Sequence, residues 1–376
     1  MFKNARIVGV NVDASVYHNN ADLVLRGDPK LCMSSSVLRA FWCCPSKWVA
    51  PIVAEDGSVS FWEFIGSKST EWGDLFDCLI LTPQMFDSKY AVSPASYEVT
   101  ENVCPSCGSE SKAKRCKACD TERMPKLATY SWNGQAGFCK KWKADREAEG
   151  KTCVSHKDHY NVKQAIARFR KFPELGEFVD ESEHQVHVAA DWHDEATGMI
   201  VPCQCLIDLV PRNDSQFYKS LADVKTTVNA RVIPWEKWCH AAGYDIQAAW
   251  NTDMFIAATG REICSFCFLL SENTAPWQPG KRMMTNDLLD PAQDMGDVAS
   301  GRRQYRKMMA AYCACLKSGN WPGYDDHDEA AGGWTIVSPN PYQEQARQFA
   351  PNFEFEDESP DAEPAPAEEA DQGIVP

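Results

Sequence analysis

The stretch CQCLIDLVPRNDSQFYKSLADVKTTV (203–228) carries the pattern that decides the fold. Asp208 stands near the end of an apolar strand, a polar turn follows, and a second strand carries Asp223 and Lys225. Residues i and i+2 of a strand point to the same face, so Asp223 and Lys225 look into one site. The short connection makes the two strands hairpin neighbours, which predicts that Asp208 lies beside Asp223.

Paired carboxylates with a lysine suit one kind of chemistry. Two ionised carboxylates repel one another, and a divalent cation relieves that repulsion. Carboxylate, water and phosphate oxygens are the hard ligands that Mg²⁺ or Mn²⁺ prefers. A lysine beside the metal can orient or help to deprotonate a water and offset charge on a phosphate in the transition state. The pattern therefore fits phosphodiester hydrolysis. The alternative is a strand-end acid and an exposed ion-pair face, because a D…DxK match often arises by chance.

The flanking sequence predicts an α/β fold with a mixed sheet flanked by helices. A hairpin is expected over 185–209 and a further strand over 262–270, from their apolar, turn-bounded patterns. Apolar residues at helical spacing predict helices at 34–48, 72–83, 157–172, 234–255 and 299–317. On the fourth of these helices, Tyr244 and Gln247 are three residues apart and share a face.

Composition sets outer limits on the function. The chain has 376 residues, 44% hydrophobic and 24% charged, which excludes a mostly disordered chain, a coiled coil and a collagen-like fibre. The formal charge of −15 excludes a bulk-basic DNA coat protein but not a nucleic-acid enzyme, which needs only local positive charge. No leader pattern opens the chain and no apolar run reaches about 20 residues, so a cytoplasmic protein without a membrane partner is expected.

Several segments together resemble the phage and prophage RecE-type exonucleases (exodeoxyribonuclease VIII), in the RecB-like branch of the PD-(D/E)xK nucleases. Besides ADVKTT (222–227), the similar segments are SSSVLRAFWCCPSKW (34–48), WGDLFDCLILTP (72–83), ADWHDEATGMIVPCQCLID (190–208) and SGNWPGY (318–324). Cys205 and Leu206 stand where that family usually has Gly or Ala and then Arg, and Asn251 stands where it often has Tyr.

The resemblance implies a restriction-endonuclease-like core and roles for the matching positions. Asp208 and Asp223 would bind Mg²⁺ (or Mn²⁺), with Asp77 as a further ligand. Lys225 would be catalytic, and Gln247 and Tyr244 would support the site or touch the substrate backbone. The implied substrate is linear duplex DNA, cut from its ends in phage recombination or replication in the host cytoplasm. A single-strand annealing protein and a homo-oligomeric ring are the implied partners.

A cysteine-rich insertion carries a second metal pattern. CPSC and CKAC place Cys104, Cys107, Cys116 and Cys119 as two CxxC pairs eight residues apart. Four thiolates suit tetrahedral Zn²⁺, and free thiols or an iron–sulphur cluster are the alternatives. In RecB-like nucleases that hold such a cluster the cysteines are split across the nuclease domain, so four local cysteines favour zinc.

These patterns divide the chain into four segments. They are an N-terminal helical part of the nuclease domain (1–101), a zinc-knuckle-like module (102–125), a nuclease core (126–345) and a disordered acidic tail (346–376). Residues 354–376 contain nine acidic residues and no basic one, so most of the net charge of −15 is expected in that tail.

Three other features bear on the site. Cys264 and Cys267 are expected as core thiols of an apolar strand, and Trp235 and Trp238, near the predicted site, are candidates to stack on a base. The histidines of the hairpin are expected to pack or face solvent. Two other functions stay open: a non-catalytic DNA-binding or scaffold protein on a nuclease fold, and an iron–sulphur RecB-like nuclease.

Overall fold

The computed structural model describes residues 1–13, 17, 26–56, 58–61, 68–111, 113–286 and 297–323. The acidic tail and the last residue of SGNWPGY lie outside the described residues. Within these ranges, no helix is both long enough and apolar enough to cross a membrane.

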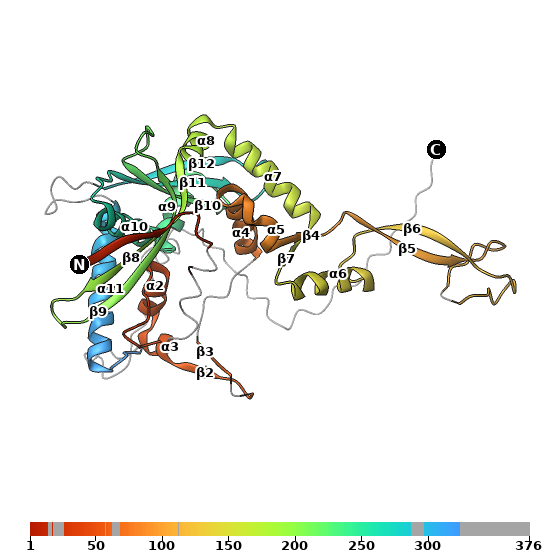
Figure 1. Cartoon of the computed structure of the whole chain (residues 1–376), viewed down its shortest axis with the longest axis horizontal. Coiled ribbons are helices and arrows are strands. Elements are labelled where there is room, and N and C mark those ends of the chain that lie inside the picture. Colours follow the sequence, from red (N-terminus) through yellow and green to blue (C-terminus); the bar gives the residue numbers. More distant parts are fainter. Residues whose placement is uncertain are drawn as a thin grey trace, which may run out of the picture. The chain divides into compact units, whose positions relative to one another are not determined.

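A six-stranded mixed sheet forms the centre of the fold (Figure 1). Its strands, in spatial order, are β1 (Phe2–Gly9), β8 (Ser182–His193), β9 (Ile200–Pro211), β10 (Ser220–Thr227), β11 (Ser265–Glu272) and β12 (Pro279–Thr285). The β10–β11 pair is parallel and the other neighbours are antiparallel. The predicted mixed α/β sheet is thus confirmed.

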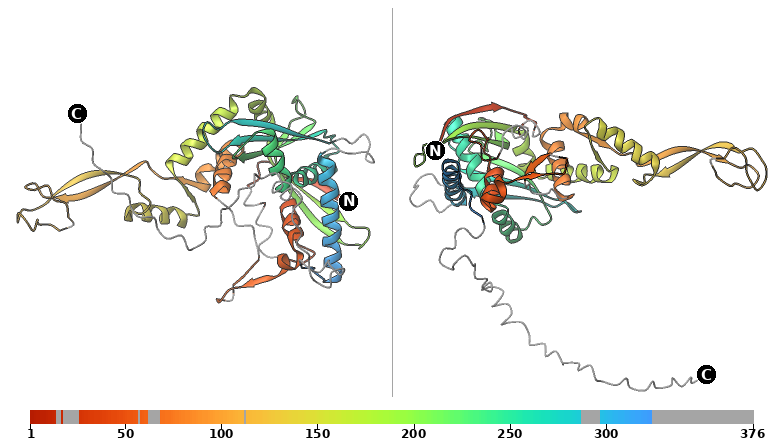
Figure 2. Two further views of the ribbon diagram at one scale, coloured as in Figure 1. Left: turned by 180° about the vertical axis from the view of Figure 1, so that it is seen from behind. Right: turned by 90° about the horizontal axis from the view of Figure 1, so that it is seen from below.

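Helices cover both faces of this sheet, each over its own apolar cluster. One cluster holds α2 (Ser35–Cys43), α3 (Pro45–Val49), α9 (Val232–Ala241), α10 (Tyr244–Thr259) and α11 (Asp297–Ser318). The other cluster holds α4 (Lys68–Leu81), α7 (His156–Arg170) and α8 (Pro173–Asp180) against β9, β10 and β11. Figures 1 and 2 show α10 and α11 next to each other, and β1 along one edge of the sheet.

Three small two-stranded sheets complete the described chain. They are β2 (Pro51–Val53) with β3 (Val59–Phe61), β4 (Tyr90–Val92) with β7 (Thr152–Val154), and β5 (Ser96–Val103) with β6 (Met124–Ser131). The remaining helical elements are η2 (Pro83–Met85), α5 (Phe86–Lys89) and α6 (Gly137–Ala148). The β5–β6 pair is an antiparallel ribbon in full register from Ser96 opposite Ser131 to Val103 opposite Met124, and it flanks the cysteine loops.

Most helices predicted from spacing lie where expected, with two differences. The 34–48 helix is two helices, because Ser34 caps α2 and Pro45 begins α3. The 234–255 helix is also two, separated at Gly243, whose φ of 68° favours glycine. An added Cβ at Gly243 would lie 2.7 Å from Arg39 Cδ, so packing as well as conformation favours glycine at this break.

Candidate active site

The two strands that carry the acidic residues separate at the site. β9 and β10 pair at Ala222 opposite Leu209, so antiparallel register places Asp208 opposite Asp223 one step further along. There the N–H of Val224 donates to Asp208 Oδ2 at 2.9 Å instead of to a neighbouring strand. The predicted juxtaposition of Asp208 and Asp223 is therefore present, at the point where the sheet opens.

Gln185, a residue that sequence reasoning missed, holds the other oxygen of Asp208. Its Nε2 donates to Asp208 Oδ1 at 2.9 Å from the neighbouring strand β8. Gln185 has a φ of 47° and no ladder partner on β9, although the register of β8 with β9 is the same on either side of it, and its side chain turns toward Asp208. A single positive-φ residue inside a strand leaves no clear signal in the sequence.

Asp223 receives two contacts and is 1% exposed. Gln247 Nε2, from the first turn of α10, donates to Asp223 Oδ1 at 2.9 Å. Lys225 forms an ion pair with the other carboxylate oxygen, and its ammonium lies 5.3 Å from the ring centroid of Tyr244. The four residues thus form one contact chain from β10 to α10.

Asp77 reaches the same site from α4, on the opposite helix layer. Its Oδ1 is buried and has no hydrogen-bond partner among the described residues. The C-terminal end of α4 is fixed by His184 of β8, whose two ring nitrogens lie 2.8 Å from the carbonyl oxygens of Leu81 and Val179. His184 therefore packs between helix ends, as expected for a structural histidine.

Burial and mutual repulsion raise the pKa of two of the three carboxyl groups. Burial, and then the Asp223 carboxylate, raises the pKa of Asp208 to about 8. Burial, and then Asp208, raises the pKa of Asp77 well above its usual range. For Lys225, burial lowers the pKa, but Asp223, Asp208 and Tyr244 outweigh it, so its pKa is raised and the side chain is an ammonium at neutral pH.

This site can be tested for its fit to a divalent cation. Asp77 offers an orphaned buried oxygen, and burial with mutual repulsion raises the pKa of both Asp208 and Asp77, so added positive charge would stabilise their ionised forms. The three carboxylates are less tightly gathered than the cysteines below, which are the one His/Cys/Asp/Glu set found within 4.8 Å in the described part of the chain. Mg²⁺ keeps several waters and takes only one or two carboxylates directly, so the donor set fits.

Two cavities open on the site from either side of Asp77. A cavity of about 540 Å³ is lined by Asp77, Lys225 and Tyr244, together with Trp238. A cavity of about 430 Å³ is lined by Asp77, Asp208 and Gln185. Asp74, one turn before Asp77 on α4, lines both cavities. Asp77, Asp208 and Lys225 therefore each border a cavity although they are largely buried, whereas Asp223 lies behind them and lines neither cavity.

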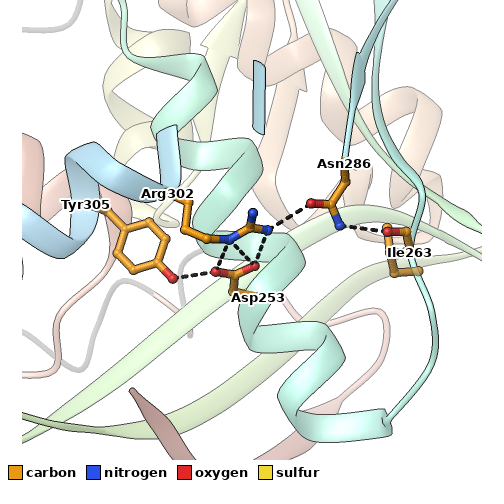
Figure 3. A network of polar contacts seen from close by, with 5 residues as sticks. All are labelled: Asp253, Ile263, Asn286, Arg302 and Tyr305. Atoms are coloured by element: carbon orange, nitrogen blue, oxygen red, sulfur yellow. Dashed lines mark hydrogen bonds and ion pairs between the residues drawn. The ribbon is translucent and has the colours of Figure 1, made fainter. Parts of the chain in front are cut away.

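A second polar network fixes helix α10, which carries Gln247 and Tyr244 (Figure 3). Arg302 of α11 donates from Nε and Nη2 to the Asp253 carboxylate at 2.7–3.1 Å, and Tyr305 donates to Asp253 Oδ2 at 2.5 Å. Arg302 also donates to Asn286 Oδ1 at 2.9 Å. A two-nitrogen guanidinium–carboxylate contact of this kind sets orientation as well as distance. The helix layer behind the site is thus held in one position.

The four cysteines of the insertion come together as predicted. The sulphur atoms of Cys104, Cys107, Cys116 and Cys119 all lie within 4.8 Å of one another. Cys107 Sγ is 3.6 Å from Cys116 Sγ, close to the roughly 3.8 Å expected between thiolates on a tetrahedral zinc ion. Hydrogen bonding from Ser109 is the main cause that lowers the pKa of Cys116 to about 6, which favours its thiolate form, whereas hydrogen bonding with Cys107 raises the pKa of Cys119.

Two expectations about neighbouring residues are wrong. Cys264 is exposed and precedes β11, which begins at Ser265, so it is not a core thiol. Trp235 is 2% exposed and packs on Tyr244 and Phe268, so it has no free face for a base. Trp238, one turn later, is 57% exposed.

Comparison with known proteins gives little further guidance. No family model matches the chain, and no curated protein matches it. A protein of Eubacterium rectale that is provisionally named an exonuclease has a TM-score of 0.45 and 13% identity, over 90% of this chain and 98% of that one. Rai1 of Scheffersomyces stipitis, solved with (3′-NADP)⁺ and calcium ion, has a TM-score of 0.23 and 10% identity, over 67% of this chain and 60% of that one. Likenesses this weak carry no argument, so the function has to be argued from the side chains.

Proposed function

We propose that the protein is a metal-dependent nuclease that hydrolyses phosphodiester bonds of linear duplex DNA from its ends. The observation that carries this proposal is the convergence of Asp77, Asp208 and Asp223 with Lys225 at an opening in the sheet. Three buried acids and a lysine beside two cavities fit a cation and a phosphate better than they fit structural packing, because unrelieved burial of carboxylates is costly.

Each side chain has a separate task in this reaction. Asp77, Asp208 and Asp223 would hold Mg²⁺ (or Mn²⁺), which supplies Lewis-acid polarisation of the phosphate and a more acidic water. Lys225, held as an ammonium by Asp223, donates hydrogen bonds to a phosphate oxygen or to the attacking water. Tyr244 lies against the ammonium, and Gln247 fixes the orientation of the Asp223 carboxylate.

The finer assignments rest on the resemblance to RecE-type exonucleases. They are exonucleolytic action in phage recombination or replication within a bacterial cytoplasm, a single-strand annealing partner, a ring-shaped homo-oligomer and a restriction-endonuclease-like core. The acidic C-terminal tail would limit nonspecific DNA binding by mimicking DNA charge. For the four cysteines we propose structural Zn²⁺, since their spacing and local grouping suit one tetrahedral ion.

The decisive test is digestion of end-labelled linear duplex DNA in Mg²⁺, with closed circular DNA of the same sequence as a second substrate. Asp223→Ala and Lys225→Ala should each reduce the rate on linear DNA by about 10³-fold or more. Lys219→Ala is the matched control, because Lys219 precedes the same strand but pairs with Glu262 at the surface. Equal activity of wild type and both site variants would refute the site, and equal cutting of circular DNA would refute exonucleolytic action.

The alternatives predict other results. A DNA-binding scaffold would bind the linear duplex without cutting it in Mg²⁺ or Mn²⁺. An iron–sulphur nuclease would be brown as purified and absorb visible light, whereas a zinc protein is colourless. Metal analysis therefore identifies the iron–sulphur alternative, and the DNA assay identifies the scaffold.

A further inference from the structure

The 540 Å³ cavity contains a large exposed aromatic side chain that the proposed hydrolysis does not use. Trp238 of α9 lines it together with Lys225 and Asp77, and 57% of its surface is exposed. An indole left in water beside a polar site forgoes the stabilisation that burial of its rings would give. Because Trp235 on the same helix is fully packed, exposure is specific to Trp238 and not general to α9 tryptophans.

The lining of this cavity combines charged and apolar side chains. Asp74, Asp77 and Lys225 supply the charged groups, and Thr226, Thr227 and Asn229 add neutral polar groups. Val228, Pro234 and Trp238 supply apolar surface. A nucleotide has the same division into a charged phosphate and an apolar, flat base. The volume also lies in the range of ordinary small-ligand sites.

The neighbouring cavities are less suitable for a base. The cavity of about 890 Å³ shares Asp74 but is lined by neither Asp77 nor Lys225, so it does not adjoin the residues that would hold the phosphate. The cavity of about 430 Å³ has no tryptophan, and its lysine, Lys89, is already paired with Asp13. Of these three cavities, only the one with Trp238 offers an aromatic face next to Lys225.

We propose that Trp238 stacks on the base of an unpaired nucleotide at the DNA end, next to the phosphate held at Asp77 and Lys225. This inference rests on the proposed nuclease function and specifies its substrate. A base inside a duplex has both faces covered by its neighbours, so the protein would act on ends whose terminal base pair has opened. Base–aromatic stacking tolerates every base, so the preference would be for an open end and not for a sequence.

The test measures the binding of DNA hairpins by fluorescence anisotropy, with the dye in the loop and Ca²⁺ in place of Mg²⁺ to hold the DNA uncut. The single open end carries two mismatched pairs, and its terminal nucleotides are either natural or abasic. Trp238→Ala should weaken binding of the natural end by about 10-fold, and Trp238→Phe by about 3-fold at most. Ile233→Ala is the control, since Ile233 lies on the same helix, is 66% exposed and does not line the cavity.

The abasic end separates stacking from a merely structural role of Trp238. Wild type should bind the abasic end about 10-fold more weakly than the natural end, while Trp238→Ala should bind both ends equally. If Trp238→Ala weakens both ends by the same factor, or neither end, the stacking proposal is wrong. If wild type neither binds these hairpins in Ca²⁺ nor cuts them in Mg²⁺, the proposed nuclease function is refuted, and the stacking proposal that rests on it is refuted as well.

Discussion

The sheet site and the cysteine insertion gather ligands in opposite ways. The carboxylates of Asp77, Asp208 and Asp223 come from α4, β9 and β10, and each is placed by a core that folds for other reasons. The four cysteines lie within 16 residues, at one end of a ribbon whose strands are mostly exposed. The residues of the sheet site are thus positioned by the folded core. The insertion has little apolar surface of its own, so the proposed zinc ion would supply much of its stability.

The largest effect is expected from removing two ligands of the proposed zinc ion while the sheet site stays intact. Cys104→Ser with Cys116→Ser should reduce bound zinc from about one equivalent to less than about 0.1, because two thiolates cannot complete the tetrahedron. The nuclease rate should change by about threefold at most, and the main unfolding transition should stay in place. Metal analysis, the DNA assay and calorimetry give the three readouts. Loss of the main transition would show that the core also depends on the insertion.

The next effect concerns the close contact between α10 and α11. A Cβ at Gly301 would lie 2.0 Å from the carbonyl oxygen of Asp245, so Gly301→Ala must push the two helices apart. We expect a loss of about 3 kcal/mol in the free energy of unfolding, measured by urea denaturation, together with reduced nuclease activity. Gly137→Ala in α6 is the control, because a Cβ there meets nothing within 4 Å, and it should be neutral or stabilising by up to about 1 kcal/mol. Equal effects at both glycines would contradict the packing argument.

A smaller effect is expected from pH in the absence of metal. The pKa of Asp208 is about 8 in the fold and ordinary in the unfolded chain, so the folded state binds the extra proton between these values. Stability therefore falls as pH rises toward 8, and a cation that displaces the proton restores it. In EDTA, Asp208→Asn should melt a few °C above wild type at pH 9 and close to it at pH 5. Differential scanning fluorimetry measures this, and a constant difference across pH would be evidence against the raised pKa.

The smallest effect belongs to the hydrogen bond of Gln185. Gln185→Leu removes the donor to Asp208 Oδ1 but keeps the approximate side-chain volume. We expect kcat to fall by about 10-fold, since a misoriented ligand weakens the metal site without removing it. Gln216→Leu is the control, because Gln216 donates to Glu177 at the surface. An equal kcat for the two variants would mean that Gln185 does not position Asp208.

Local patterns predicted much of this architecture from the sequence. The apolar spacing of Leu75, Phe76 and Ile80 located α4, and the short polar turn after Asp208 located the pairing of β9 with β10. The two CxxC pairs predicted their own cluster, because sequence neighbours need no fold to meet. Whether these residues perform catalysis stays a prediction, since proximity alone does not establish a reaction.

The missed features depend on geometry between distant segments. Gln185, which itself has a positive φ in β8, donates to Asp208, and Gly301 of α11 lies against the backbone of Asp245 in α10. Neither contact has a period or spacing that a sequence pattern could display. The prediction that Cys264 is a core thiol was wrong because β11 begins one residue after it.

The β5–β6 ribbon that carries the cysteines starts and finishes at nearly the same place. Ser96 lies opposite Ser131 in the β5–β6 ladder, so 34 intervening residues begin and end at adjacent points. Replacing that loop by a short turn would preserve the path of the backbone on either side, and every rung of the ladder is an equivalent place to shorten it. The insertion can therefore be shortened or removed between two fixed end points, and its length can vary without any change of register in the six-stranded sheet.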